Sequence, residues 1–580
     1  MDPHSQHHSN STSVDSIDSW MSIRSPGEDG SPTMAASPTA LNLPFHGNRD
    51  IIDEIFSYLS VDQYMTPKTF DITSFNQFLP EDDQDIHNRK QNRRKLCSLA
   101  VMCKSFMVPA LDQLWRSLDS LFPLLKLLPA FKMTDGTWVL RGKVTEQEWA
   151  RFNWYAQRVR RFTYNRDPPE LDIALHTYFR LAQLHPEPLF PNLHILQADF
   201  LVSGICLFFC DSLRELTLDT LTEVEDKLCG TVLDSLSEIG ARLQKIVLNG
   251  IGLSRDTVRM VLNFDSVRHL ELEGMGQAIN MEILEGICAL QNLSFLAIDF
   301  KNSILLLPEL QTLMAMGDTG FWLRGLRTLT ISGPLHFSIM FVRRIASQNL
   351  EVLISYTYAP LAPAHSPSAG EKQDFIEMVA EKWKNTLTHF EFQLFPALPL
   401  TEENDVPTEE LSTSALTPLL SLRGLKYLRF LGYVMEISDE EICRCARAWP
   451  ELTVFILPYG MPGRPRPTVA ALAMLAKYTP KLKYLTISLQ TTGRRFDAGP
   501  FANDPGLRHN LHTLTVVNPS DDAWELTDAL HFARHIDHFF PNLVSLASFR
   551  TVDEAKWSQV YDIIRMYQSV RRDAVNMVPW

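Results

Sequence analysis

Large apolar residues return along the chain at one spacing, in which the first, fourth and sixth positions of a hexapeptide are leucine or a similar residue. The copies run from about residue 193 to about residue 546, with a mean period of about 29 residues. Apolar and other residues alternate through the second half of each copy, which predicts a short β-strand with one buried face. Clear copies lie at 213–218, 293–298, 326–331, 482–487 and 511–516, and degenerate ones at 243–248, 267–272, 387–392, 425–430 and 452–457.

The segments between these predicted strands have the spacing of amphipathic helices. One strand and one helix per repeat predict an α/β fold, an irregular right-handed leucine-rich-repeat solenoid with a parallel inner sheet over residues 191–552. The number of copies favours this fold over an ordinary α/β domain with parallel strands. The predicted helices lie at 257–264, 281–290, 338–347, 371–385, 438–449 and 469–478.

The repeats lack the Asn or Cys that usually follows the last strand leucine by three residues. Leu218 is followed by Leu221, and Leu272 by Met275. A ladder of buried asparagines is therefore not expected, and the curvature should be irregular.

The rest of the chain divides by composition. Residues 1–40 are rich in Ser, Asp, His, Thr and Pro, and we expect them to be disordered because they cannot bury enough apolar surface. Residues 41–120 predict a small helical module that an irregular polar loop, 60–94, interrupts. Residues 121–190 should form a helical connection and a first repeat, and residues 553–580 a helix that caps the solenoid.

Composition excludes several classes of protein. The 580 residues carry a net charge of −14, which disfavours nonspecific binding to nucleic acid. The longest apolar run, 201–210, is about half the length that a bilayer span needs, so no membrane segment is expected. No charged and apolar leader opens the chain, and we therefore expect a cytoplasmic or nuclear location.

The chain offers little that predicts catalysis. It contains no nucleophile elbow, phosphate-binding glycine loop, zincin helix or dinucleotide fingerprint, so we expect a protein that is not an enzyme and needs no cofactor. Its eight cysteines form no Cys-x-x-Cys pair, which favours structural thiols. His535 and His538 are spaced to share a helix face, but without a third ligand they favour no metal site.

Residues 43–118 resemble an F-box, in the style of F-box proteins from mushroom-forming fungi. The resemblance rests on Leu43-Pro44, on an Ile-Ile-x-x-Ile-Phe-x-x-Leu helix at 51–59, and on the apolar patterns at 99–106 and 110–115. With the repeats, nearly all of the chain beyond residue 40 is similar to an F-box/leucine-rich-repeat protein. It departs from the pattern in the spacing between Leu43-Pro44 and the first helix, and in the long segment 60–94.

This resemblance implies a substrate receptor of an SCF cullin–RING ubiquitin ligase. The F-box would dock on the adaptor subunit, and through it on a cullin, while the repeats hold a protein substrate. The alternative is a non-catalytic repeat scaffold whose F-box-like helices only cap the solenoid. The residues implied in adaptor binding are Leu43, Pro44, Ile51, Ile55, Leu59, Leu99, Cys103 and Trp115.

Strand alternation assigns the side chains that should face the concave side of the solenoid. Early repeats place acidic residues there, and later repeats place apolar and aromatic ones, a combination that predicts a protein partner with a basic segment. The alternatives are that these are scattered surface residues, or that the partner binds the loops at 360–370 or 396–413. The acids are Glu215, Asp219, Glu271, Glu273 and Asp299, and the others are Phe295, Val352, Ile354, Tyr356, Tyr427 and Tyr484. Of these, the predicted substrate-binding residues are Phe295, Ile354, Tyr356, Tyr427, Tyr484, Glu271 and Glu273.

Overall fold

The computed structural model divides the chain into two compact units, Met1–Ser266 and Val267–Trp580. The predicted disordered tail, Leu43-Pro44 and residues 60–80 of the predicted loop lie outside the described residues. The structure describes residues 49–59, 81–164, 173–199, 201, 203–275, 277–300, 323–358, 368–395, 409–460, 464, 466–490, 509–517, 526–548 and 554–576.

The described part of the first unit begins with the helices α2 (Arg49–Ser57), α3 (Glu81–Met102) and α4 (Lys104–Leu114). Helix α3 begins at Glu81, so the part of the predicted loop from 81 to 94 is helical and that part of the prediction is wrong. The segment has few apolar residues and therefore no amphipathic pattern. Its acidic N-terminal turn and its many Arg, Lys and Gln residues nevertheless favour a helix.

Among the described residues of the first unit, five strands form a parallel sheet, in the order in which they follow in the chain. Helical segments connect them, as the repeat pattern predicts. The strands are β1 (Ser117–Leu118), β4 (Arg161–Tyr164), β5 (Ile195–Ala198), β6 (Glu215–Leu221) and β7 (Lys245–Gly250), and the helices are α5 (Phe122–Leu125), α6 (Glu146–Ala156), α7 (Leu175–Leu184), η3 (Ser203–Phe208), α8 (Asp226–Glu238), α9 (Arg255–Met260) and η4 (Val261–Asn263).

An antiparallel hairpin, β2 (Phe131–Thr134) and β3 (Thr137–Leu140), interrupts this series. Its turn is Asp135-Gly136, and both residues have a positive φ, 52° and 82°. An Asp-Gly pair between two extended segments favours this kind of two-residue turn. The Asp-Gly pair therefore favours the hairpin, which was not predicted because the sequence analysis expected helices in this region.

In the residues of the second unit that the structure describes, ten strands belong to a parallel sheet, again in chain order. They are β8 (His269–Glu273), β9 (Phe295–Asp299), β10 (Thr328–Gly333), β11 (Val352–Tyr358), β12 (His389–Phe395), β13 (Tyr427–Leu431), β15 (Val454–Ile456), β17 (Tyr484–Ile487), β18 (Thr513–Val516) and β19 (Ser545–Ser548). A further short parallel pair is β14 (Val434–Met435) and β16 (Tyr459–Gly460). The helices are α10 (Met281–Ala289), α12 (Leu335–Arg344), α13 (Ala369–Lys382), η6 (Thr413–Ala415), α14 (Leu416–Leu419), α15 (Asp439–Ala448), α16 (Val469–Tyr478), α17 (Leu526–Phe539) and α18 (Glu554–Asn576).

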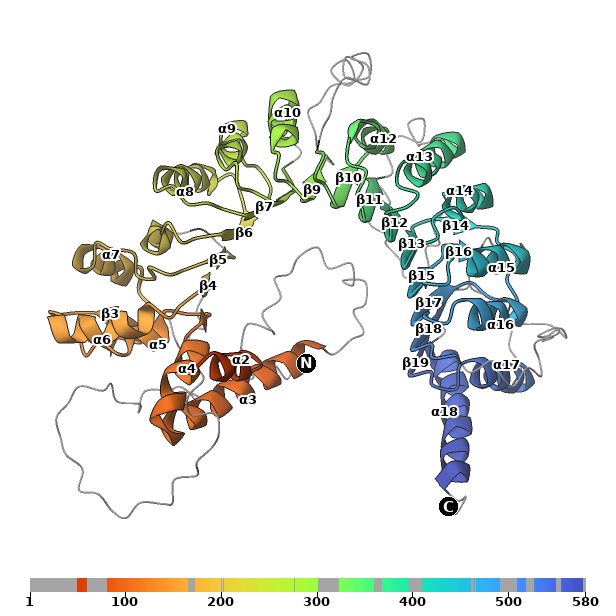
Figure 1. Cartoon of the computed structure of the whole chain (residues 1–580), viewed down its shortest axis with the longest axis horizontal. Coiled ribbons are helices and arrows are strands. Elements are labelled where there is room, and N and C mark those ends of the chain that lie inside the picture. The colour runs from red at the N-terminus through yellow and green to blue at the C-terminus, as the bar shows by residue number, and fades with distance from the viewer. Residues whose placement is uncertain are drawn as a thin grey trace, which may run out of the picture. The chain divides into compact units, whose positions relative to one another are not determined.

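Within each unit the helices that connect the strands lie on one side of them (Figure 1). Parallel strands alternating with helices at the predicted period confirm the α/β leucine-rich-repeat fold. We call the side of the sheet away from the helices the open face. It carries the positions that were predicted to be concave.

Strand register explains why the leucine spacing persists. Leu296, Leu329, Leu353 and Phe390 pair in one row across four neighbouring strands, and all four side chains are fully buried. Burying one such side chain contributes about 1.5–3 kcal/mol, so every repeat adds to a continuous core. The first, fourth and sixth positions of the copy at 326–331 are likewise buried.

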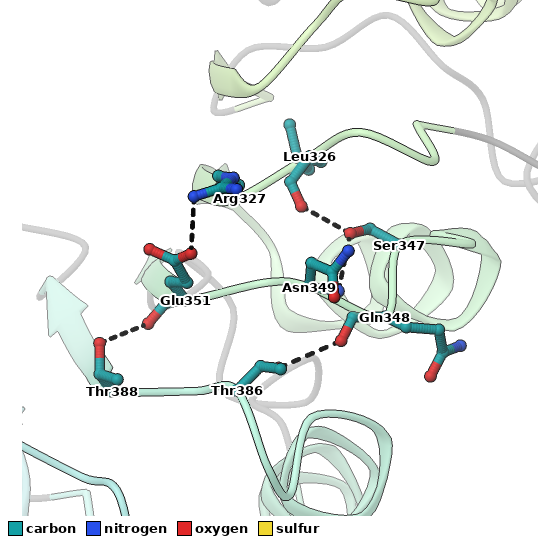
Figure 2. A network of polar contacts seen from close by, with 8 residues as sticks. All are labelled: Leu326, Arg327, Ser347, Gln348, Asn349, Glu351, Thr386 and Thr388. Carbon is teal, nitrogen blue, oxygen red and sulfur yellow. Dashed lines mark hydrogen bonds and ion pairs between the residues drawn. The ribbon is translucent and has the colours of Figure 1, made fainter.

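Hydrogen bonds from side chains to the backbone link neighbouring repeats just before the strands (Figure 2). The buried Ser347 hydroxyl donates to the Leu326 carbonyl at 2.6 Å, and the Trp383 indole N–H donates to the Ser347 carbonyl at 2.8 Å. Thr386 similarly donates to the Gln348 carbonyl at 3.2 Å. These residues, instead of a ladder of asparagines, satisfy carbonyls at the turns between repeats.

The last helix, α18, packs against α17 and the last strand, β19. Its Trp557, Val560 and Ile564 are buried. Gln568 donates to the Leu543 carbonyl at 2.9 Å, so polar contacts also hold the helix to the turn before β19. This arrangement covers apolar surface at the end of the strand series, as a capping helix does.

Replacing Ser347 by Ala should destabilise the second unit by about 1–2 kcal/mol, because the Leu326 carbonyl loses its buried donor. Urea unfolding followed by tryptophan fluorescence would measure the change. The control is Thr386→Val at a partly exposed site, where water can replace the lost donor and the cost should stay under about 0.5 kcal/mol. Equal losses in the two variants would contradict this account of the turns.

Candidate binding surfaces

Helix α2 has two apolar faces. Ile52 and Phe56 are buried, and the Phe56 ring packs edge-to-face on Phe106 of α4 with their centroids 5.6 Å apart. Ile51 and Ile55 lie on the other face and are 39% and 51% exposed. Tyr58, one further helical step along the same stripe, is 69% exposed. The face of α2 that packs on α4 is thus buried, and a second apolar stripe of the same helix faces outward.

The residues predicted to bind an adaptor fall into separate groups in the structure. Ile51 and Ile55 are exposed, and Leu59, Leu99 and Cys103 are partly exposed. Trp115 is buried with its ring 4.8 Å from that of Tyr155, so it belongs to the core of the first unit.

Sequence reasoning missed three exposed apolar residues of the N-terminal helices. Val101 and Met102, at the end of α3, are each 69% exposed, as is Tyr58. Tyr58 follows Ile51 by seven residues, so helical spacing alone could have identified it.

The open face of strands β8 to β13 is organised in three rows by the strand register. Side chains in one row lie on neighbouring strands, which are about 4.8 Å apart. The first row is His269, Phe295, Thr328, Val352, His389 and Tyr427; the second is Glu271, Ala297, Thr330, Ile354, Glu391 and Arg429; the third is Asp299, Ser332, Tyr356, Gln393 and Leu431. Glu273 is the last residue of β8, the strand next to the one that ends with Asp299.

The predicted substrate-binding residues all occupy strands of the second unit, but they differ in accessibility. Phe295, Tyr427, Tyr484 and Glu273 are partly exposed, whereas Ile354, Tyr356 and Glu271 are buried, at 2%, 7% and 4% exposure. Tyr484 continues the first row on β17, beyond β13 and β15.

The predicted acidic patch is divided between the two units. Glu215 and Asp219 lie on β6 of the first unit. Glu271 and Glu273 on β8 and Asp299 on β9 belong to the second.

Histidines that the sequence analysis did not single out stack on aromatic rings of this face. The His269 ring lies 3.8 Å from the Phe295 ring with an interplanar angle of 6°, and His389 lies 3.8 Å from Tyr427 at 9°. The Nε2 atom of His269 also contacts Oε1 of Glu271. Each stack joins residues of two different repeats. The two partners can therefore be identified only when the register of the strands is known.

A buried ion pair lies in the second row. Arg429 Nη1 is 3.5 Å from Glu391 Oε1, and their side chains are 6% and 0% exposed. Burial raises the pKa of the Glu391 carboxyl to about 7, although Arg429 opposes the rise. Burial, reinforced by the charge of Arg429, lowers the pKa of His389 to about 4.

Tyr358 and Phe395 pair in the row that follows the third, next to Tyr356 of the third row. Tyr358 stacks on Phe395 at 5.2 Å, and Tyr356 meets the same ring edge-on at 5.6 Å. Burial raises the pKa of the Tyr358 hydroxyl, and the negative charges of Asp299 and Glu273 raise it further.

Within the part of the chain that the structure describes, no three His, Cys, Asp or Glu side chains gather as a metal site would require. Over the same residues, no helix has both the length and the apolar character to cross a bilayer.

Comparison with known proteins identifies no family for this chain. No model of a protein family matches the chain, and no curated protein matches it. Among solved structures, a leucine-rich-repeat protein of Leptospira interrogans is similar at 14% identity and a TM-score of 0.31, over 74% of this chain and 99% of that one. The order and register of the strands support the leucine-rich-repeat fold.

The Glu391–Arg429 pair makes stability depend on pH. Because folding raises the pKa of Glu391 from 4.5 to about 7, ionisation of this carboxyl weakens the folded state as pH rises through that interval. Replacing Glu391 by Gln removes this effect. Relative to the wild type, the variant should therefore gain on the order of 2 kcal/mol between about pH 5 and about pH 8.

Urea unfolding at a series of pH values would test this expectation. The control is Thr330→Val, which changes a buried residue of the same row that does not ionise. Parallel pH profiles for Glu391→Gln and the wild type would contradict the expectation.

Proposed function

We propose that the chain is a substrate-receptor subunit of an SCF cullin–RING ubiquitin ligase. In this proposal, helices α2 to α4 dock on the adaptor subunit and the open face of the repeats holds a protein substrate. The chain performs no bond chemistry. It raises the concentration of the substrate near the ubiquitin carrier, in the cytoplasm or the nucleus.

The observation that carries the adaptor half of the proposal is the outward apolar stripe of α2. Ile51, Ile55 and Tyr58 are exposed although the opposite face of the helix already packs on α4. Val101 and Met102 add further exposed apolar surface at the end of α3. Apolar surface of this kind marks a protein-binding site, and it lies in the segment that resembles an F-box.

The repeat half of the proposal rests on the composition of the open face. Partly exposed aromatic rings, Phe295, Tyr427 and Tyr484, can serve as anchors at a protein interface, and the carboxylates of β8 and β9 can orient a charged partner. The alternative function, a repeat scaffold without an adaptor, shares this half. Adaptor binding is therefore the property that separates the two.

Replacing Ile55 by Asp should weaken binding of the purified SCF adaptor by at least ~2 kcal/mol, about thirtyfold, because the interface would bury an unpaired charge. Isothermal titration calorimetry with the full chain would measure the change. The fold should tolerate the substitution, since Ile55 is 51% exposed.

The matched control is Val224→Asp, which places the same charge at an 87% exposed apolar residue of the same unit, outside α2 to α4. It should bind the adaptor as the wild type does. No binding by the wild type, or equal binding by Ile55→Asp, would contradict the receptor function and favour the scaffold.

Replacing Tyr427 and Tyr484 together by Ala should release the substrate and leave adaptor binding intact. Both rings are partly exposed in the first row, so their removal takes away anchors at little cost to the core. Proximity labelling with the wild type and the double variant would compare the captured proteins. The same partners for both would place the substrate site elsewhere.

A further inference from the structure

A hollow of about 890 Å³ opens in the helix layer of the first unit, where its lining comes from the end of α7, from η3 and from the end of α8. Both α7 and α8 lie on the same side of the strands (Figure 1). The other neighbouring strands of this sheet are joined by at least one α-helix, but β5 and β6 are joined by η3, a 3-10 helix of six residues. The short connection leaves a space that a full helix would fill.

The lining of the hollow is largely apolar. Leu207 and Phe209 contribute nearly buried side chains, Pro186 and Pro188 follow the end of α7, and Ile239 at the end of α8 is 46% exposed. A concave surface with apolar walls is the usual form of a binding site.

Exposed apolar surface continues from the hollow along α7. Leu175 and Phe179 are 65% and 62% exposed, and with Ala182, which lines the hollow, they have the i, i+4, i+7 spacing of one helix face. At a rise of 1.5 Å per residue this stripe is about 10 Å long. The hollow and the stripe together form an elongated surface, which suits a segment of polypeptide better than a compact ligand.

Three carboxylates lie at the hollow, and the chain does not neutralise them. Glu187, Asp211 and Glu238 are exposed, and in the described part of the chain none of the three carboxylates takes part in an ion pair or a hydrogen bond. The contacts that Glu187 and Asp211 make use their backbone carbonyls, with His185 and Arg214. Among the described residues that line the hollow, none is Lys or Arg.

Hydrogen bonds and ring packing fix the walls of the hollow. The His185 ring packs on Trp149 of α6 with their centroids 4.9 Å apart, and its Nδ1 atom lies 2.9 Å from the Glu187 carbonyl oxygen. On the other side, the Ser212 hydroxyl donates to the Leu193 carbonyl at 2.8 Å. A partner would therefore meet a surface that is already ordered, which lowers the entropic cost of binding.

We propose that the hollow binds a linear segment of a partner protein in which a large apolar side chain is flanked by Lys or Arg. The apolar side chain packs against Leu207, Phe209 and Ile239, and the flanking cations meet the three carboxylates. Apolar burial supplies affinity, and the opposite charges orient the segment. The inference does not rest on the proposed function, because it uses neither α2 to α4 nor the open face of the repeats.

Cys206 provides a probe at the site itself. It lines the hollow and is exposed, whereas the other seven cysteines are buried or partly exposed. Peptides of about ten residues, long enough when extended to cross the hollow and the stripe, would be selected on the full chain from a random library. Those that bind would be tested for their effect on the alkylation of Cys206 by iodoacetamide, followed by mass spectrometry.

Bound peptides at saturating concentration should slow the alkylation of Cys206 at least about fivefold. Cys443 of the second unit serves as the internal reference and should react at an unchanged rate. The peptides that protect Cys206 should share a large apolar residue next to Lys or Arg.

The charged part of the site is tested by the triple variant Glu187→Gln, Asp211→Asn, Glu238→Gln. It should bind the protecting peptides at least about tenfold more weakly, and its affinity should depend less on salt. The new side chains keep the shapes of exposed ones, so the melting temperature should stay close to that of the wild type.

The matched control removes three negative charges from exposed residues of the same unit that do not line the hollow. The variant is Glu146→Gln, Glu223→Gln, Asp256→Asn. Because it changes the net charge by the same amount, it should bind the peptides within about twofold of the wild type.

The apolar part of the site is tested by Ile239→Ala, which should weaken peptide binding about fivefold because less apolar surface is buried in the complex. Its control, Ile251→Ala, makes the same change at a 72% exposed residue of the same unit outside the hollow, and it should leave binding unchanged.

A selection in which no peptide slows the alkylation of Cys206 would overturn the inference. Protecting peptides that bind the charge-neutral triple variant as tightly as the wild type would overturn it too, because the partner would then not be recognised by its cations. Self-association of the full chain that itself protects Cys206 would make a second copy the occupant, and would likewise contradict the inference. Adaptor binding is measured separately, in the titration of Ile55→Asp.

Discussion

The register of the parallel strands is the constraint on which the rest of the structure depends. In the second unit each strand pairs with the next without a shift over the rows described, so leucines lie beside leucines and open-face residues beside open-face residues. A slip of one residue would exchange the two faces of a strand and expose its core side chains. The same register that builds the core therefore fixes which side chains meet on the binding surface.

The pairing of the strands provides no hydrogen-bond donors for some of the backbone carbonyls in the turns between repeats. Ser347 and Trp383 donate to carbonyls of the preceding turns, and Trp449 donates in the same way to Leu419. These donors differ in size, whereas an asparagine ladder would repeat one side chain. The spacing of the turns can therefore vary from repeat to repeat, which accounts for a leucine pattern that stays regular while the segments between the strands differ in length.

The core and the strand order could be predicted from the sequence because apolar spacing reports burial directly. The segment at 81–94 could not, since its helix is favoured by charge and propensity and has no apolar stripe. The surface was predicted only in part. Alternation identified Phe295 and Tyr427 residue by residue, but the stacks with His269 and His389 join different repeats, and no local pattern contains both members.

Strands β8 and β12 show how a repeat array can carry one geometry with two different balances of charge, since each has a histidine stacked on a ring of the next strand and a glutamate two residues after it. Where Arg429 lies beside the glutamate, the two charges are buried together, and burial still raises the pKa of Glu391 to about 7, so the attraction of Arg429 does not fully offset the cost of burying the carboxylate. Where Ala297 occupies the equivalent position, the buried glutamate of the arrangement, Glu271, is contacted by His269 of its own strand. A solenoid can retain a buried charge at such a cost because neighbouring repeats add stability independently of that row. The strand register therefore fixes the position of each side chain, while the residue on the next strand sets its charge environment.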